Sequence, residues 1–205
     1  VALGGKSLPG NPMIPQLRAA LAVARGQYDT AAAVLDSLLR ARPNDASTRR
    51  LAAGGLANLA DLRGRLIEAA EQQRMMRDLA VQLGNRGAVY NARLDEPFRG
   101  LWFRGDVARG KAVVDRVTAS AQFGSLPPGQ RNYPRLLTLY ALAGDSVRAR
   151  EMFRAWERLP RAGTNQIVGH RILGDLAMAE RRYDDAVREY SAVNDDVGAR
   201  IVCDL

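Results

Sequence analysis

Apolar residues along this chain recur every three or four positions, which is the spacing of one face of an α-helix. After Gly26, for example, apolar side chains fall at Ala31, Leu35 and Leu38. No segment alternates apolar and polar residues between turn signals, so we expect no β-strands and an all-α fold. The pattern predicts ten helices, over residues 13–25, 28–41, 46–62, 65–83, 87–104, 107–122, 130–143, 146–159, 165–180 and 183–193.

One short pattern recurs five times, consisting of a turn residue, usually Gly, and a small residue five positions later. Successive turn residues are 37 to 41 positions apart. The small residue would let the helices on either side of the turn approach closely, so each repeat predicts a helical hairpin. The five pairs are Gly26 with Ala31, Gly64 with Ala69, Gly105 with Gly110, Gly144 with Ala149, and Arg181 with Ala186.

Five such hairpins in succession predict an α-solenoid, in which each hairpin covers the apolar face of the one before it. Pro and Gly residues separate the hairpins where this scheme requires chain breaks. We therefore expect a connector over residues 1–12, the repeat array over 13–193, and the start of a further repeat or a truncated end over 194–205.

The first hairpin resembles a tetratricopeptide repeat. Ala19, Ala31, Leu35 and Pro43 stand where that motif places its two small residues, its large apolar residue and its closing Pro. The other hairpins lack the closing Pro, and the spacing exceeds the roughly 34 residues of the family. The resemblance implies a superhelix of about five stacked hairpins that presents a concave groove to a peptide or protein.

A second resemblance is to the helical-repeat tails of bacterial serine/threonine kinases and related signalling regulators. The phrases that carry it are Phe103–Asp106 and Ala141–Asp145, in Arg- and Ala-rich surroundings. The chain has no Gly-rich phosphate loop, no His-Arg-Asp loop and no Asp-Phe-Gly, so a kinase domain would lie outside these residues. Such a tail implies a larger signalling protein, with an extracytoplasmic location if that protein is membrane-anchored, whereas a free-standing array would be cytoplasmic.

The net charge is +8, with 28 Arg and 2 Lys among 205 residues. The Arg residues are dispersed and most have an acidic neighbour, whereas a nucleic-acid site needs a basic cluster on one face. No apolar segment is long enough to span a membrane. We therefore expect a protein or peptide partner and no nucleic acid.

Catalytic and metal-binding constellations are missing from the sequence. His170 is the only histidine and Cys203 the only cysteine, so neither a multi-His nor a multi-Cys metal site can form. Asp184 and Asp185 stand at a predicted helix start, where carboxylates stabilise the helix dipole. We expect no catalysis and no cofactor.

The family resemblance places the exposed inner surface on the first helix of each hairpin. Trp102 beside Arg99 has the composition that dominates binding energy at interfaces, although Trp102 could instead pack under Phe98. Arg131 and Arg171 could each bind a carboxylate through two hydrogen bonds. The inner positions are Gln16, Asn58, Asp61, Asp95, Arg99, Trp102, Arg131, Thr138, Arg171 and Asp175, of which Asn58, Asp95, Arg99, Trp102, Arg131, Arg171 and Asp175 are predicted to form the partner-binding groove.

Two alternatives to a protein-binding scaffold remain open. A helical-repeat sensor would bind a small molecule or signal peptide and regulate a linked kinase or transcription factor, and an enclosed apolar pocket would favour it. A reader of RNA bases needs matched side chains at equivalent positions of successive repeats. Asn58, Arg99, Thr138 and Asp175 show no such regularity.

Overall fold

The structure, a computed structural model, describes residues 13–160 and 166–194, and every regular element within those ranges is a helix. The predicted all-α fold is confirmed. The expected connector (1–12) and the residues beyond Asn194 lie outside the described ranges. The helices are α1 (Met13–Ala24), α2 (Tyr28–Ala41), α3 (Ala46–Leu62), α4 (Leu66–Gln82), α5 (Arg86–Asn91), α6 (Asp95–Arg104), α7 (Val107–Thr118), α8 (Ala121–Ser125), α9 (Tyr133–Leu142), α10 (Ser146–Glu157), α11 (Gln166–Ala179) and α12 (Tyr183–Asn194), with 3₁₀ turns η1 (Ala92–Leu94) and η2 (Pro128–Gln130).

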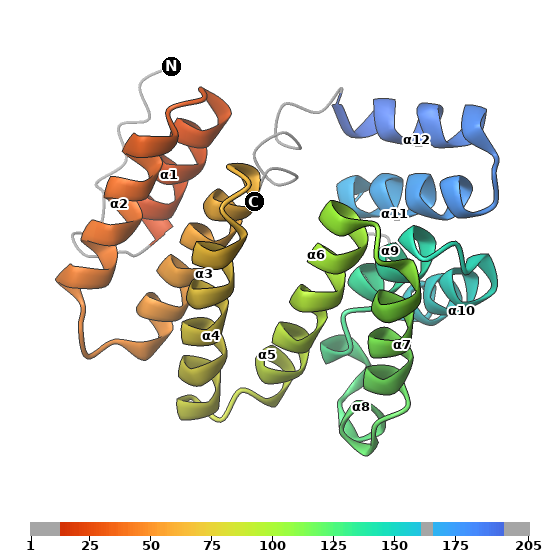
Figure 1. Cartoon of the computed structure of the whole chain (residues 1–205), viewed down its shortest axis with the longest axis horizontal. Coiled ribbons are helices and arrows are strands. Elements are labelled where there is room, and N and C mark those ends of the chain that lie inside the picture. Colours follow the sequence, from red (N-terminus) through yellow and green to blue (C-terminus); the bar gives the residue numbers. More distant parts are fainter. Residues whose placement is uncertain (1–12, 161–165, 195–205) are drawn as a thin grey trace. The chain divides into compact units, whose positions relative to one another are not determined.

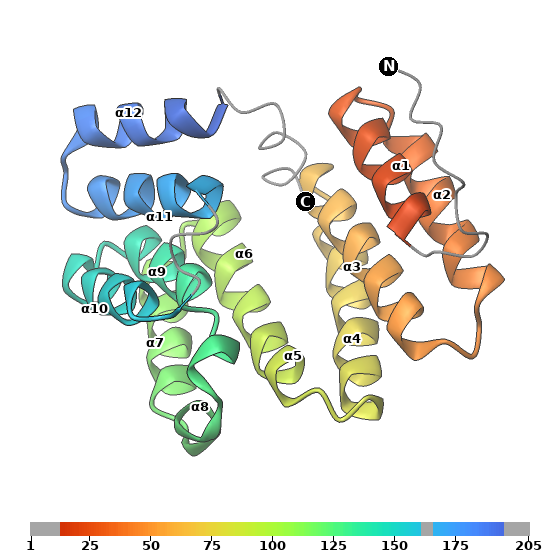
Figure 2. The same ribbon diagram turned by 180° about the vertical axis from the view of Figure 1, so that it is seen from behind.

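The chain divides into two compact units between Leu83 and Gly84. The first unit contains two antiparallel hairpins, α1/α2 and α3/α4, which pack together through α2 and α3 (Figure 1). The second contains the hairpins α6/α7, α9/α10 and α11/α12, also visible from behind (Figure 2). There α9 contacts both α7 and α11, so each hairpin packs on the next. Stacked hairpins of this kind are the building principle of an α-solenoid.

The turn of every hairpin lies at the residue that the repeat predicted. Gly26, Gly64, Gly105 and Gly144 have φ between 62° and 72°, in the left-handed region that glycine enters without a steric penalty. The equivalent residue of the last hairpin, Arg181, has φ 59°. A side chain in this conformation costs about 1 kcal/mol, so the same turn is formed here against a local penalty.

The small residue after each turn lies in the contact between the two helices of its hairpin. Ala31, Ala69 and Ala149 are fully buried, and Ala186 is 1% exposed. A Cβ added to Gly110 would lie 2.5 Å from the leucine that faces it on α6. Side chains larger than these would force the paired helices apart, as the sequence pattern indicated.

Two predicted helices are interrupted. The helix expected over 87–104 is broken by the 3₁₀ turn η1, because Pro97 has no N–H and its ring clashes with the carbonyl four residues earlier. Pro97 is tolerated in the first turn of α6 instead. The helix expected over 107–122 ends at Thr118, and the side chain of Ser120 then caps α8 by accepting from the N–H of Phe123 at 3.3 Å.

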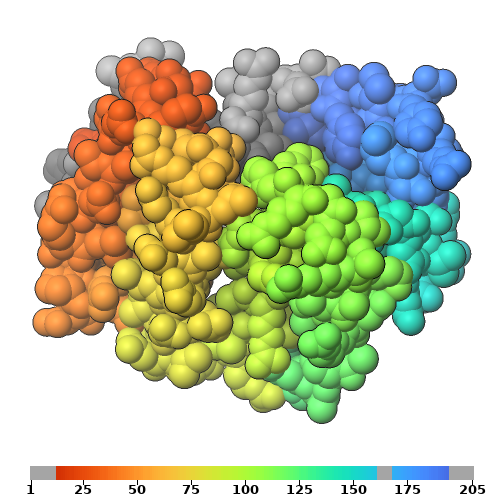
Figure 3. All heavy atoms as spheres, in the orientation of Figure 1, coloured from red at the N-terminus to blue at the C-terminus, as the bar shows by residue number. Residues whose placement is uncertain are grey.

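The two units have cores of different composition. In the first, small side chains dominate, and the buried cluster comprises Ala19, Ala22, Ala31, Leu35 and Leu59. In the second, larger residues are fully enclosed, among them Tyr90, Leu136, Leu137, Tyr140 and Ile172. In the space-filling view the helices of the second unit, from green to blue, form a continuously packed body (Figure 3).

Candidate functional site

An exposed aromatic stack lies on α6 in the second unit. Trp102 leaves 59% of its surface exposed, and its ring stacks on Phe98 with the centroids 5.9 Å apart and 10° between the planes. The spacing of four residues places both rings on one side of the helix. The sequence predicted that Trp102 either lines the surface or packs under Phe98. In the structure its ring stacks on Phe98 while more than half of the residue stays exposed, so each prediction holds in part.

Helix α9 holds this stack in place through Arg135. Its guanidinium carbon lies 3.7 Å from the centroid of the Phe98 ring, a cation–π contact, and its Nη2 lies 3.4 Å from Oδ1 of Asp95. Both charged side chains are about three-quarters buried, so solvent screens their attraction less than at an open surface. We call Asp95, Phe98, Trp102 and Arg135 the α6 aromatic site.

Arg99 does not lie on the surface beside Trp102, as the sequence suggested, because the structure leaves only 6% of it exposed. It follows Asp95 by one helical turn in α6. The exposed pair expected from Trp102 and Arg99 is replaced by Trp102 with Phe98, and the cation beneath Phe98 comes from Arg135.

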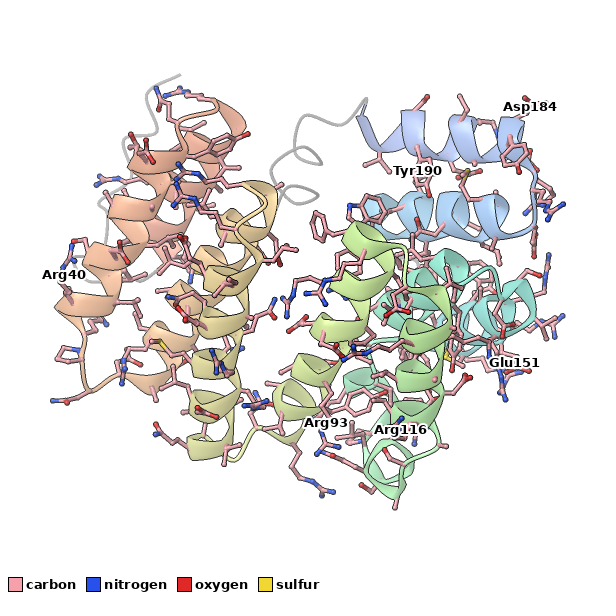
Figure 4. The ribbon with its side chains drawn as sticks, in the orientation of Figure 1. Arg40, Arg93, Arg116, Glu151, Asp184 and Tyr190 are labelled. Carbon is pink, nitrogen blue, oxygen red and sulfur yellow. The ribbon has the colours of Figure 1, made fainter. Side chains whose placement is uncertain are left out.

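Asp175 lies in a contact between helices. Its Oδ2 accepts a 2.5 Å hydrogen bond from the hydroxyl of Thr138 on α9, and its Oδ1 accepts a 2.7 Å bond from Tyr190 on α12. Figure 4 shows Tyr190 pointing from α12 toward α11. Burial, reinforced by the hydrogen bond to Asp175, raises the pKa of Tyr190 well above its usual range. Asp175 therefore joins three helices of the second unit.

The two arginines predicted to bind carboxylates differ in their surroundings. Arg131 donates to the backbone carbonyls of Gly124 and Leu126, both at 2.9 Å, and its guanidinium carbon lies 5.1 Å from the Phe123 ring centroid. These contacts tie the loop after α8 to the start of α9. Arg171 is half-buried on α11, where its positive charge opposes the rise in the pKa of Tyr190.

Asn58 belongs to a different site, a cavity of about 240 Å³ in the first unit. The walls are mostly aliphatic and come from all four helices of that unit. We call this space the α1–α3 cavity, because most of its lining lies on those two helices. The residues that line it are Gln16, Ala19, Val23, Leu35, Arg50, Leu51, Gly54, Gly55, Asn58, Leu59, Leu62 and Met76.

Sequence reasoning missed Arg135 and Arg50, although both continue faces that it had identified. Arg135 falls four residues after Arg131 and three before Thr138, and Arg50 falls eight before Asn58. Extending the predicted inner positions by one helical turn would have included Arg135, and extending them by two turns would have included Arg50. Contacts between residues as far apart as Asp95 and Arg135 leave no such local signal.

The residues considered for chemistry have structural partners. Nδ1 of His170 lies 2.9 Å from Oε2 of Glu189. Asp184 and Asp185 occupy the first turn of α12, and Asp185 forms ion pairs with Arg182 and Arg188. The hydrogen bonds from these arginines lower the pKa of Asp185. These contacts and the helix dipole account for the carboxylates at this helix start.

No group of three or more His, Cys, Asp or Glu side chains within 13–160 and 166–194 could hold a metal ion. None of the described helices has both the length and the apolar character needed to cross a bilayer. In comparisons with known proteins, no family model, no curated protein and no solved structure matches this chain. Its function therefore has to be argued from the two sites themselves.

Proposed function

We propose that this chain is a non-catalytic scaffold that binds a protein partner through the α6 aromatic site, as part of a longer bacterial signalling protein. The single observation that carries the proposal is the stack itself, an exposed Trp102 fixed on Phe98, which Arg135 holds from the neighbouring hairpin. The tetratricopeptide resemblance supports it, because arrays of that family offer a surface on the first helix of each hairpin.

The physical advantage of such a site is preorganisation. Arg135 of α9 contacts both Phe98 and Asp95 of α6, so the helix that carries Trp102 is already held in place. Little conformational entropy of this helix therefore remains to be lost when a partner binds. A tryptophan ring buries a large apolar area when a partner covers it, so even a small interface gains much hydrophobic free energy. Tryptophan and arginine are also among the residues that most often dominate binding energy at interfaces.

A specific observation favours a second function, that of a helical sensor for a small molecule. The α1–α3 cavity is lined mainly by aliphatic side chains with a few polar groups, which is the usual composition of a small-molecule site. Sensor and scaffold are compatible, because the cavity belongs to the first unit and the aromatic site to the second.

Site-specific photo-cross-linking in the native cells tests the scaffold proposal. The photoreactive residue p-benzoylphenylalanine is placed at Trp102 in one variant and at Tyr183 in the control. Tyr183 is a matched control because it is an aromatic residue of the same unit and is 57% exposed. We expect a discrete adduct with one partner from position 102 and none from position 183.

The adduct identifies the partner, whose affinity is then measured with purified proteins. Adducts of equal yield and the same composition from both positions would show that the α6 aromatic site has no special role. The same conclusion would follow if position 102 gave no adduct while a partner was recovered through another surface.

A further inference from the structure

Arg50 gives the α1–α3 cavity a distinctive polar feature. Its Nε is buried and has no hydrogen-bond partner among the described residues. No Asp or Glu is found among the described residues that line the cavity, so no carboxylate of the lining offsets this guanidinium. Arg50 as a whole is only half-buried, but a buried donor left without an acceptor is unfavourable, and an anion is the chemical complement of a guanidinium.

The rest of the lining complements an apolar group. Val23, Leu35, Leu59 and Met76 contribute aliphatic or thioether surface from four different helices. A volume of about 240 Å³ is smaller than the roughly 300–1,000 Å³ of sites for drug-sized ligands, so the occupant is small. One charged group and one short apolar chain fit this combination of size and lining.

Two adjacent glycines in α3 provide the space. Glycine in a helix interior lowers helix stability by about 1 kcal/mol relative to alanine, so the pair Gly54–Gly55 destabilises α3 locally. Gly55 is required by packing, since a Cβ there would lie 2.9 Å from Leu35. Gly54 is not, because its Cβ would meet only the flexible end of Met76, at 3.3 Å. The glycine at position 54 therefore keeps the cavity open, and helix packing alone would not require it.

We propose that the α1–α3 cavity binds a small amphiphilic carboxylate, with the carboxylate on Arg50 and the apolar chain against Val23, Leu59 and Met76. This inference deepens the second of the two proposed functions by naming the class of ligand. Gln16 on α1 and Asn58 on α3 are the other polar residues of the lining.

Binding is tested by calorimetric titration of the full chain with octanoate. Two ligands with the same chain length serve as controls, the neutral 1-octanol and the cationic octylammonium. The same chemistry could also be presented by a peptide that ends in leucine, so a short peptide of this kind is compared with its carboxy-terminal amide. We expect saturable binding of a carboxylate ligand and at least tenfold weaker binding of octanol and octylammonium.

The charged contact is tested with Arg50→Met, which keeps an unbranched side chain and removes the cation. Hydrogen bonds to charged groups contribute more free energy than neutral ones, so losing this contact should weaken octanoate binding roughly 10- to 100-fold. Gly54→Leu is the second variant, because its side chain would fill the cavity and abolish binding. Circular dichroism confirms that each variant is folded, and if Gly54→Leu is not, Arg50→Met decides alone.

Methyl resonances of isotope-labelled methionine locate the ligand. The chain has five methionines, of which Met76 lines the cavity and Met152 and Met178 lie in the second unit. Octanoate should shift the Met76 methyl and leave the other two unchanged. Binding of octanoate but not of the peptide assigns a free amphiphile, and the reverse assigns a chain terminus.

The proposal is overturned if no carboxylate binds saturably, if octanol binds as tightly as octanoate, or if folded Arg50→Met keeps the wild-type affinity. None of these results would affect the scaffold proposal, because cross-linking at Trp102 reports on the second unit alone. Equally, failure of that cross-linking leaves the Met76 experiment unchanged.

Discussion

Gly110→Ala tests the close approach of helices within a hairpin. Gly110 is buried in α7, and the added methyl carbon would lie 2.5 Å from Cγ and 2.8 Å from Cδ2 of Leu101 on α6. Cγ is the branch point of a buried side chain, so neither a rotation of its end nor a small shift relieves the overlap. Either Leu101 adopts a different rotamer or α7 moves away from α6.

The magnitude follows from two opposing effects. Overpacking of this kind costs about 1–3 kcal/mol, whereas replacing a helical glycine by alanine gains about 1 kcal/mol. Gly110→Ala should therefore lower the free energy of unfolding by about 1 kcal/mol. Gly100→Ala is the matched control, because Gly100 lies in α6 and a Cβ there meets no atom within 4 Å. The control should raise the stability by about 1 kcal/mol.

Urea unfolding followed by tryptophan fluorescence is the appropriate assay. Both tryptophans, Trp102 and Trp156, belong to the second unit, so the signal reports the unit that contains the substitution. We expect the two variants to differ by about 2 kcal/mol, with Gly100→Ala the more stable. Equal stabilities, or a more stable Gly110→Ala, would show that the small residue after the turn does not govern helix approach.

Three further predictions concern the last two hairpins. Arg181→Gly should raise the free energy of unfolding by about 1 kcal/mol in urea titrations, because glycine adopts the left-handed turn without penalty; no gain would contradict this. Thr138→Val should cost about 2 kcal/mol by removing a hydrogen bond to the Asp175 carboxylate, and an unchanged midpoint would disprove that contribution. The pKa of Tyr190 is raised in the folded state, so its contribution is present below pH 10 and is lost as the pH rises further. Tyr190→Phe should reduce the alkaline slope of stability by about 1.4 kcal/mol per pH unit, and an unaltered slope would refute this.

Much of the fold could be predicted because its signals are local. The left-handed turns at Gly26, Gly64, Gly105 and Gly144 and the buried small residues after them are set within a few residues of sequence. The break before Pro97 is also a local signal, because a proline inside a helix removes a hydrogen bond, although the helix predicted over 87–104 ran through it.

The candidate sites were less predictable because they depend on contacts between hairpins. Helical spacing places Arg99 and Trp102 near each other, but only the packing of α6 against the rest of the second unit determines that Arg99 is buried and Trp102 exposed. The contact of Arg135 with Asp95 joins residues 40 positions apart. The α1–α3 cavity likewise requires the relative positions of four helices, which no single segment specifies.

The most direct test of the central claim is a calorimetric titration of the cross-linked partner, once identified, against the wild-type chain, Trp102→Ala and Tyr183→Ala. A tryptophan that dominates an interface contributes at least about 2 kcal/mol, so Trp102→Ala should weaken binding by about 30-fold or more. Tyr183→Ala should stay within twofold of the wild type. Equal affinities for all three proteins would contradict the assignment of the α6 aromatic site as the binding surface.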